Sequence, residues 1–256
     1  MNNDRNNNAF TLIELMVSIG IIAILISIAI PALSGVRQRA RDAIGLSNLR
    51  QTSVAMENYV QAYGGWLPYA KEGSGFRLTP EVPPSSVIRP GYWDTSSYWS
   101  SLFHEVAPWD QWFGMWVYPD PRRPTSKPWA IDSTSDSPFS NGVSSLEYAR
   151  SLYARPEIWE SGGIIEDRDS VLRGVRHSEV RYPSAKVSLF DSELCARVRC
   201  DDPKTVKRAM LFVDGHAAMK ALSDANAPVK GRLPELAAYG ALAVHDTAGG
   251  ARGRDY

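Results

Sequence analysis

Residues 9–31, AFTLIELMVSIGIIAILISIAIP, decide the fold of this chain. The run from Met16 to Leu33 contains no charged residue and is long enough to span, or nearly span, the hydrocarbon core of a bilayer. Glu14 places one carboxylate near the start of this apolar run. An ionisable group at membrane depth costs roughly 2.5–3.5 kcal/mol on insertion scales, so it usually has a partner and a function. The segment therefore predicts a membrane helix that has a function besides anchoring the protein.

The stretch Ala9-Phe10-Thr11-Leu12-Ile13-Glu14-Leu15 resembles the cleavage and methylation signal of type IV pilins and type II secretion pseudopilins. The resemblance implies that a prepilin peptidase removes leader residues 1–9, that Phe10 becomes N-methylated, and that Phe10, Glu14 and Pro31 act in assembly. Glu14 would be the fifth residue of the mature chain and Pro31 the twenty-second, as is common in that family. In that family the residue before the cleavage site is usually glycine, whereas this chain has Ala9.

Two simpler interpretations of the same segment stay open. One is a cleaved secretory signal peptide, with small residues such as Ser27 and Ala29 near the cut. The other is an uncleaved signal anchor in which Glu14 is incidental. The long apolar run and the early carboxylate argue against the first.

Charges flanking the helix bear on its orientation. The far flank carries Arg37, Arg39, Arg41 and Arg50 against Asp42, and a positive-inside count would place it in the cytoplasm. The cleavage motif requires the opposite, a cytoplasmic leader. Because cleavage depends on that orientation, we expect a single-pass protein of the cytoplasmic (inner) membrane, in contact with lipid and with its globular domain outside the cytoplasm.

A helical pattern continues beyond the membrane segment. Apolar residues at Leu46, Leu49, Met56 and Val60 have steps of three and four, with one position missing, and Gly64-Gly65 then stops the helix. We therefore expect a helix of about 50 residues, in which 10–33 form the membrane and assembly part and 34–64 an amphipathic continuation. The amphipathic part can pack on its own domain, on neighbouring helices, or on both.

Composition and length limit the nature of the region beyond the helix. The chain has 256 residues with 28 basic and 28 acidic side chains, so it lacks the basic excess of a nucleic-acid binder and no nucleic-acid partner is expected. Residues 65–220 suffice for one extracytoplasmic globular domain, and the Ala/Gly-rich tail 221–256 is expected to be poorly ordered past about residue 246.

A change to period two predicts the C-terminal sheet. Four segments have the pattern of strands: 186–190, 194–199, 208–213 and 216–220. Asp214-Gly215 is interpreted as a two-residue type I′ hairpin turn, because both residues tolerate positive φ. The expected fold class is therefore α+β, a long N-terminal helix packed on a C-terminal antiparallel sheet, as in pilins.

Two further segments resemble a large pilin-like family with a His, nine residues, then Asp-Gly near its C-terminus. The first ends in YGGWLP at residues 63–68, and the second is 178–220, with Asp214-Gly215 at the expected place. Lys204 stands where the family has its His, so no role for that His carries over.

Residues 69–177 are rich in aromatics, and Trp109, Trp112 and Trp116 step by three and four. Core packing is the simpler interpretation, and an exposed patch for a partner or a glycan is the alternative. No HExxH, G-x-S-x-G, Walker loop or G-x-G-x-x-G is present in the sequence. We therefore expect no enzymatic activity and no cofactor; a membrane-anchored extracytoplasmic enzyme or binding module is the alternative.

Two small groups of residues could carry further chemistry. Cys195 and Cys200 either form a small-loop disulfide outside the cytoplasm or stay reduced near a hairpin. Asp191, Asp214 and His216 could converge on a cation such as calcium if their strands are neighbours. Ordinary turn chemistry is the simpler interpretation of these three residues, and no metal is expected.

Overall fold

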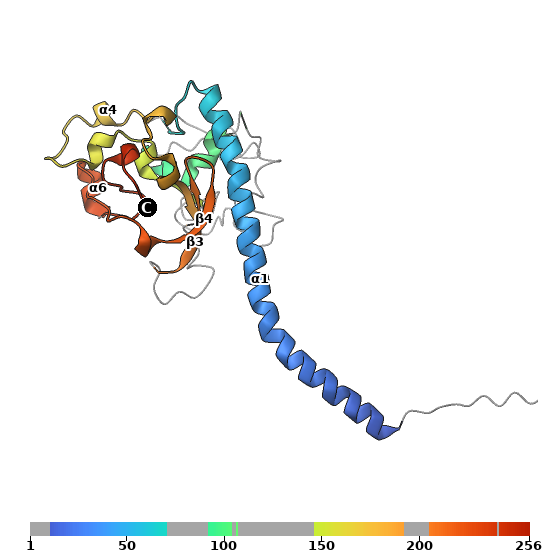
Figure 1. The fold of residues 1–256 in the computed structure, drawn as a ribbon. Helices are drawn as coiled ribbons and strands as arrows, with labels where there is room; N and C mark the ends of the chain where they lie inside the picture. The colour runs from blue at the N-terminus through green and yellow to red at the C-terminus, as the bar shows by residue number, and fades with distance from the viewer. Residues whose placement is uncertain (1–10, 71–91, 104–105, 107–145, 192–204, 240) are drawn as a thin grey trace, which may run out of the picture. The chain divides into compact units, whose positions relative to one another are not determined.

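The computed structural model describes residues 11–70, 92–103, 106, 146–191, 205–239 and 241–256 (Figure 1). Contacts divide the chain into two compact units, residues 1–43 and 44–256, and each is described by itself. The longer elements are helix α1 (Leu12–Ala62) and strands β1 (Leu146–Tyr148), β2 (Val187–Asp191), β3 (Lys207–Phe212) and β4 (Ala217–Ala221). Short helices are α2 (Thr95–Tyr98), α4 (Arg168–Val171), α6 (Pro234–Tyr239) and the 3₁₀ turns η1 (Tyr92–Asp94), η2 (Trp99–Phe103), η3 (Arg150–Leu152), η4 (Pro156–Trp159), η5 (His177–Glu179), η6 (Pro183–Ala185), η7 (Leu222–Asp224) and η8 (Gly250–Arg252).

Helix α1 has 51 residues and runs through Pro31, which confirms the long helix expected from the sequence. It ends where the glycine pair predicts. Gly64 and Gly65 adopt left-handed φ values of 65° and 87°, which a side chain would disfavour. The Gly65 N–H donates to the Val60 carbonyl at 2.7 Å, the long hydrogen bond of a Schellman C-cap.

The C-terminal sheet has four antiparallel strands in the order β1-β2-β3-β4. Together with α1 it confirms the α+β class. Strands β2, β3 and β4 lie within one residue of their expected positions, whereas β1 was not predicted and segment 194–199 lies outside the described residues. All five residues of β2 are buried, as suits a strand inside the sheet.

The loop from β3 to β4 contains Asp214 and Gly215, but it is not the two-residue turn expected. The Gly215 N–H donates to the Phe212 carbonyl and the Phe212 N–H to the His216 carbonyl, both at 2.9 Å. Gly215 has φ of 87°, while Asp214 is not among the residues with positive φ. This pattern fits a three-residue loop, a type I turn followed by a glycine bulge. The expected type I′ turn is wrong because only one residue of the pair needs the left-handed region.

The core of unit 44–256 lies between one face of α1 and the sheet. Leu49, Met56 and Val60 of the helix join Leu189 and Leu211 of the sheet in one cluster of buried side chains. In Figure 1 the cyan end of α1 runs beside β3 and β4. The amphipathic half of the helix therefore packs on its own domain, and additional packing on neighbouring helices stays a prediction.

The described part of the aromatic middle belongs to the same core. Tyr92, Trp99 and Phe103 are at most 1% exposed. The Trp99 indole N–H donates to the Leu146 carbonyl at 2.9 Å, so its polar atom is satisfied inside the core. Core packing is thus the correct interpretation for these residues, while Trp109, Trp112 and Trp116 lie outside the described part of the chain.

The tail contradicts the expectation of disorder past residue 246. His245, Asp246, Thr247 and Asp255 are all buried, and the Asp255 N–H donates to the Ala185 carbonyl at 2.8 Å. Small residues and glycines in 241–256 let the backbone approach the domain closely, so composition alone misjudged this segment.

Candidate functional site: the start of the N-terminal helix

Glu14 closes a reciprocal cap at the start of α1. Its Oε2 accepts hydrogen bonds from the Thr11 backbone N–H at 2.8 Å and from the Thr11 hydroxyl at 2.9 Å. In return the Glu14 N–H donates to Thr11 Oγ1 at 3.3 Å. This is a capping box, in which a Thr and a Glu three residues later satisfy the free N–H groups of a helix start. The carboxylate therefore has a partner within its own chain.

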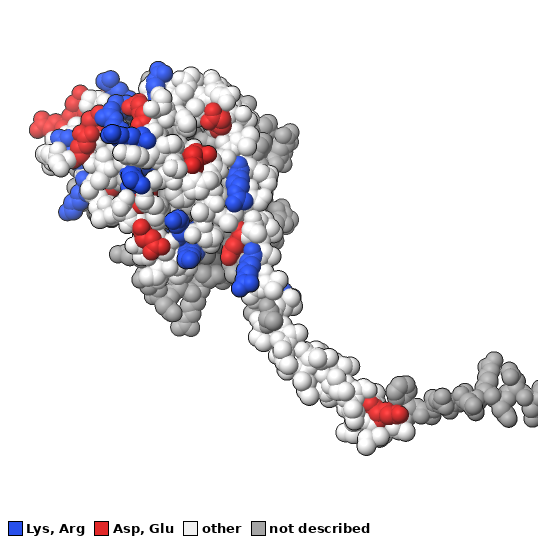
Figure 2. All heavy atoms as spheres, in the orientation of Figure 1, with Lys and Arg blue, Asp and Glu red and all other residues white. Residues whose placement is uncertain are grey.

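The surroundings of this cap are apolar and uncovered. An 18-residue window of α1 has a mean hydropathy of 2.7, and none of it is buried within the protein. Figure 2 shows the apolar stretch of α1 as white apart from one red group near its start. By length and composition this helix can cross a membrane, although a signal sequence would pass the same test.

The comparison with family models favours the membrane-helix interpretation. Residues 4–30 match the family described as the prokaryotic N-terminal methylation motif. No curated protein and no solved structure matches the chain. The match covers Ala9, Phe10 and Glu14, so this chain carries a prokaryotic N-terminal methylation motif on an apolar helix capable of spanning a membrane. It does not reach residues 47–68 or 178–220, and the resemblance to the His-x9-Asp-Gly family stays a prediction.

The predicted residues of this site are only partly within the described chain. Ala9 and Phe10 lie outside the described residues, Glu14 lies in the first turn of α1, and Pro31 lies inside the helix. Thr11 is the residue that the sequence analysis missed. The spacing Thr-x-x-Glu before an apolar run is a capping-box signature and would have identified it.

The candidate cation ligands do not converge. Asp214 and His216 contact each other in the β3–β4 loop, with 2.6 Å between Asp214 Oδ1 and His216 Nδ1. Asp191 is the last residue of β2, at the other end of the strand from Val187, which pairs with Phe212. Among the described residues no group of three or more His, Cys, Asp or Glu could hold a metal ion. Cys195 and Cys200 lie outside the described residues, so their bonding stays a prediction.

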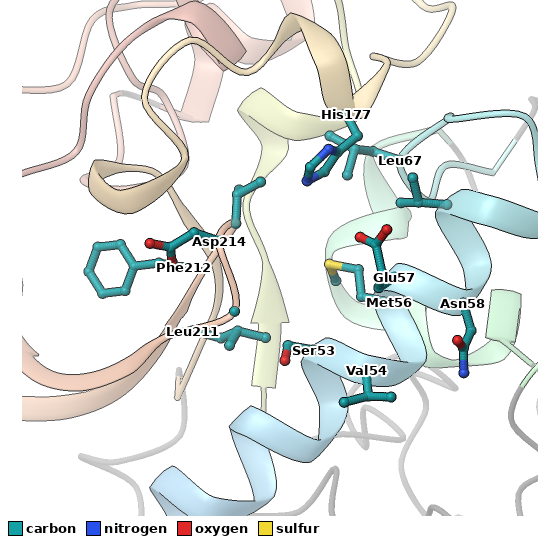
Figure 3. A pocket seen from close by; sticks show the side chains of 13 residues that line it. Ser53, Val54, Met56, Glu57, Asn58, Leu67, His177, Leu211, Phe212 and Asp214 are labelled. Atoms are coloured by element: carbon teal, nitrogen blue, oxygen red, sulfur yellow. The ribbon is translucent and has the colours of Figure 1, made fainter.

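A cavity of about 350 Å³ lies between α1 and the β3–β4 loop (Figure 3). Glu57 from the helix, His177 from η5 and Asp214 from the loop bring polar groups to it. Apolar side chains such as Met56 and Leu211 line the rest. The polar groups come from three separate elements, and Asp214 is engaged by His216.

Proposed function

We propose that this chain is a structural, non-enzymatic pilin-like or pseudopilin subunit. A prepilin peptidase cuts it between Ala9 and Phe10, and the new N-terminus is methylated. The subunit then assembles with copies of itself or with other pilin-like subunits into a type IV pilus or a type II secretion filament. The observation that carries the proposal is the methylation motif on an uncovered apolar helix with one carboxylate.

Location and orientation depend on processing. Because cleavage takes place on the cytoplasmic side, the leader lies in the cytoplasm and α1 crosses the inner membrane once. Unit 44–256 then lies outside the cytoplasm. In the membrane, lipid covers the apolar side chains that the chain itself leaves exposed; in the filament, neighbouring helices replace the lipid.

Glu14 gives the assembly its register. Cleavage creates an ammonium group at Phe10, and the ammonium of one subunit neutralises the Glu14 carboxylate of the next. The pairing removes the cost of an unpaired carboxylate in lipid. The capping box with Thr11 complements this role, because it holds the carboxylate at the helix start through two hydrogen bonds, and a carboxylate has lone pairs for further partners.

The first test is the mass of the mature N-terminal peptide from membranes. We expect N-methyl-Phe10 as the first residue. Retention of Met1, or a start near Ile30, would contradict the proposal and support an anchor or a secretory signal, respectively.

The second test separates charge from capping. Glu14→Gln keeps a side-chain oxygen for the capping box but removes the charge, since Gln serves at this position as well as Glu. Incorporation into filaments or secretion complexes should fail or slow, while the membrane level stays equal or rises. Thr11→Ala removes the hydroxyl but keeps the charge, and should assemble better than Glu14→Gln. Glu166→Gln, a change of the same kind at an exposed site of the domain away from this cavity, is the control. Wild-type incorporation of Glu14→Gln would show that the charge is incidental.

One observation favours the alternative, a membrane-anchored binding module: the cavity beside Glu57 and His177. Under that alternative the apolar helix only anchors the domain, so Glu14→Gln would leave function unchanged and substitutions lining the cavity would abolish it. Incorporation that falls for Glu14→Gln and is unchanged for His177→Ala supports the filament subunit, whereas incorporation unchanged for Glu14→Gln supports the anchored module.

A further inference from the structure

Lys186 and Asp255 form an enclosed pair of opposite charges. Lys186 Nζ lies 3.3 Å from Asp255 Oδ1, and the two side chains are 0% and 1% exposed. Apolar side chains of Val187, Phe212 and Val244 form a buried cluster beside them. Water has no access to these reactive atoms.

The backbone holds the two side chains face to face. The Asp255 N–H donates to the Ala185 carbonyl at 2.8 Å, and the Val187 N–H donates to Asp255 Oδ2 at 2.7 Å. Asp255 is thus fixed to the residues on both sides of Lys186. Fixing two reactive groups in this way removes most of the entropic barrier between them.

Burial disfavours the charged form of Lys186. Each buried ion costs several kcal/mol, and a lysine that gives up one proton becomes a neutral amine. Burial lowers the pKa of Lys186, and the negative charges of Asp255 and, more weakly, Asp246 oppose this shift. Asp246 is engaged elsewhere, by the Trp159 indole N–H at 3.2 Å and the Leu242 N–H at 2.8 Å. A desolvated neutral lysine is a nucleophile.

Two further groups complete a reaction geometry around the pair. Thr247 Oγ1 accepts a hydrogen bond from Lys186 Nζ at 2.5 Å and donates one to Asp255 Oδ1, so it connects the amine to one carboxyl oxygen. The Val187 N–H points at the other oxygen, Oδ2. A backbone N–H in this position stabilises negative charge that develops on a carbonyl oxygen during attack.

We propose that Lys186 and Asp255 condense to an intramolecular isopeptide bond. The Lys186 Nζ lone pair attacks Asp255 Cγ, and the charge that develops on Oδ2 is held by the Val187 N–H. Oδ1 takes one proton from the Lys186 ammonium before the attack and a second one through the Thr247 hydroxyl after it; the Cγ–Oδ1 bond then breaks, and one water molecule leaves. Oδ2 remains as the carbonyl oxygen of the new amide. No oxidant, reductant or second substrate is required.

The bond would tie the start of β2 to residues 250–256 through a covalent loop. It would replace two buried charges with one neutral amide, and it would keep residues 241–256 on the domain. A filament subunit outside the cytoplasm gains resistance to unfolding from such a link, although the condensation itself does not depend on the proposed function.

The test is mass spectrometry of the full chain, purified folded from membranes in detergent. The intact wild-type mass should be lower by one water molecule than the mass calculated for its observed N-terminus. Tandem spectra of a digest should contain one branched peptide that joins the Lys186 and Asp255 segments. A folded wild-type protein with the full calculated mass and two separate linear peptides would overturn the proposal and leave an ion pair.

Two variants make the assignment specific. Lys186→Arg keeps a cation but removes the nucleophilic amine, so the full calculated mass should return. Water lost by cyclisation at Asp214-Gly215 would persist in this variant and so is distinguished. Thr247→Val removes the hydroxyl relay at nearly unchanged volume and should accumulate the uncondensed form. Condensation at the wild-type rate in Thr247→Val would refute the role of Thr247.

Discussion

The two halves of α1 have similar apolar side chains and opposite surroundings. From Leu12 to Leu33 the large apolar side chains are all at least 48% exposed. From Leu49 to Val60 the apolar face is at most 7% exposed, because the domain covers it. A segment whose apolar surface its own chain leaves open needs lipid or other chains to cover it, whereas the second segment is stabilised by its own fold.

The charged side chains of the two regions differ in exposure, as the apolar side chains do. Glu14 sits on an uncovered helix and is held by Thr11. Lys186 and Asp255 are enclosed, with Thr247 and the Val187 N–H completing their hydrogen bonds. The exposed Glu14 carboxylate can bind a group on another subunit, whereas the buried Lys186–Asp255 pair can stabilise only its own domain. Changes in the enclosed region should therefore reduce stability, and changes in the open region should affect insertion and assembly.

The largest effect is expected at the enclosed pair. Asp255→Ala leaves the buried Lys186 nitrogen without its partner and prevents the proposed isopeptide bond; loss of one partner of a buried pair alone costs about 3–5 kcal/mol. Urea unfolding of the detergent-solubilised chain, followed by Trp fluorescence, measures the loss. Asp224→Ala, an exposed aspartate in η7, should cost no more than about 0.5 kcal/mol. Equal effects of the two changes would remove the distinction between enclosed and open charges.

The comparison within α1 is tested by one substitution at two positions. Ile22 and Ile44 are exposed to a similar extent, 54% and 51%, but only Ile22 lies in the apolar run. Arg at the centre of a membrane helix costs about 2.5–3.5 kcal/mol on insertion scales, so Ile22→Arg should reduce the membrane-inserted fraction. Ile44→Arg should insert like wild type. Carbonate extraction of membranes measures both, and equal insertion would contradict a membrane role for the first half.

A smaller loss of stability is expected from a change at Gly215 in the β3–β4 loop. Gly215→Ala forces a side chain into the left-handed region, which costs about 1–2 kcal/mol, and its Cβ would lie 3.3 Å from Ser53 Oγ. Gly163→Ala meets no atom within 4 Å and has no left-handed φ, so it should be neutral or slightly stabilising. Thermal unfolding of both variants gives the difference, and a neutral Gly215→Ala would argue against the glycine-bulge loop.

The smallest effect is expected at a half-exposed ion pair. Glu235 accepts a hydrogen bond from Arg168 Nε at 2.9 Å. Burial tends to raise the pKa of Glu235, but hydrogen bonds from its own backbone N–H, Arg168 and Trp93 outweigh this and lower it. The contribution of the ionised Glu235 to the free energy of unfolding is therefore present above pH 4.5, and it is lost as the pH falls through the lowered pKa. Because the site is partly exposed, Glu235→Gln should cost at most about 1 kcal/mol near neutral pH and nothing in acid. A cost that persists below that range would exclude a charge effect.

Local patterns explain why much of the fold could be predicted. The apolar run, the Gly64-Gly65 stop and the alternation of three strands act over a few residues, so the helix and the α+β class were accessible from the sequence. The capping partner Thr11 was equally local and was simply missed. Asp214-Gly215 marked the loop correctly in position, but the hydrogen bonds of Phe212 decided its type.

The sequence by itself determined the membrane helix, its carboxylate and its methylation motif, because all three are properties of contiguous residues. Only the tertiary structure decided that the tail packs on the domain and that Lys186 meets Asp255. These two residues are 69 positions apart, and neither has a neighbour in sequence that signals the other. Their contact exists because the Asp255 and Tyr256 N–H groups both donate to the Ala185 carbonyl just before β2. Only the folded chain produces this pairing.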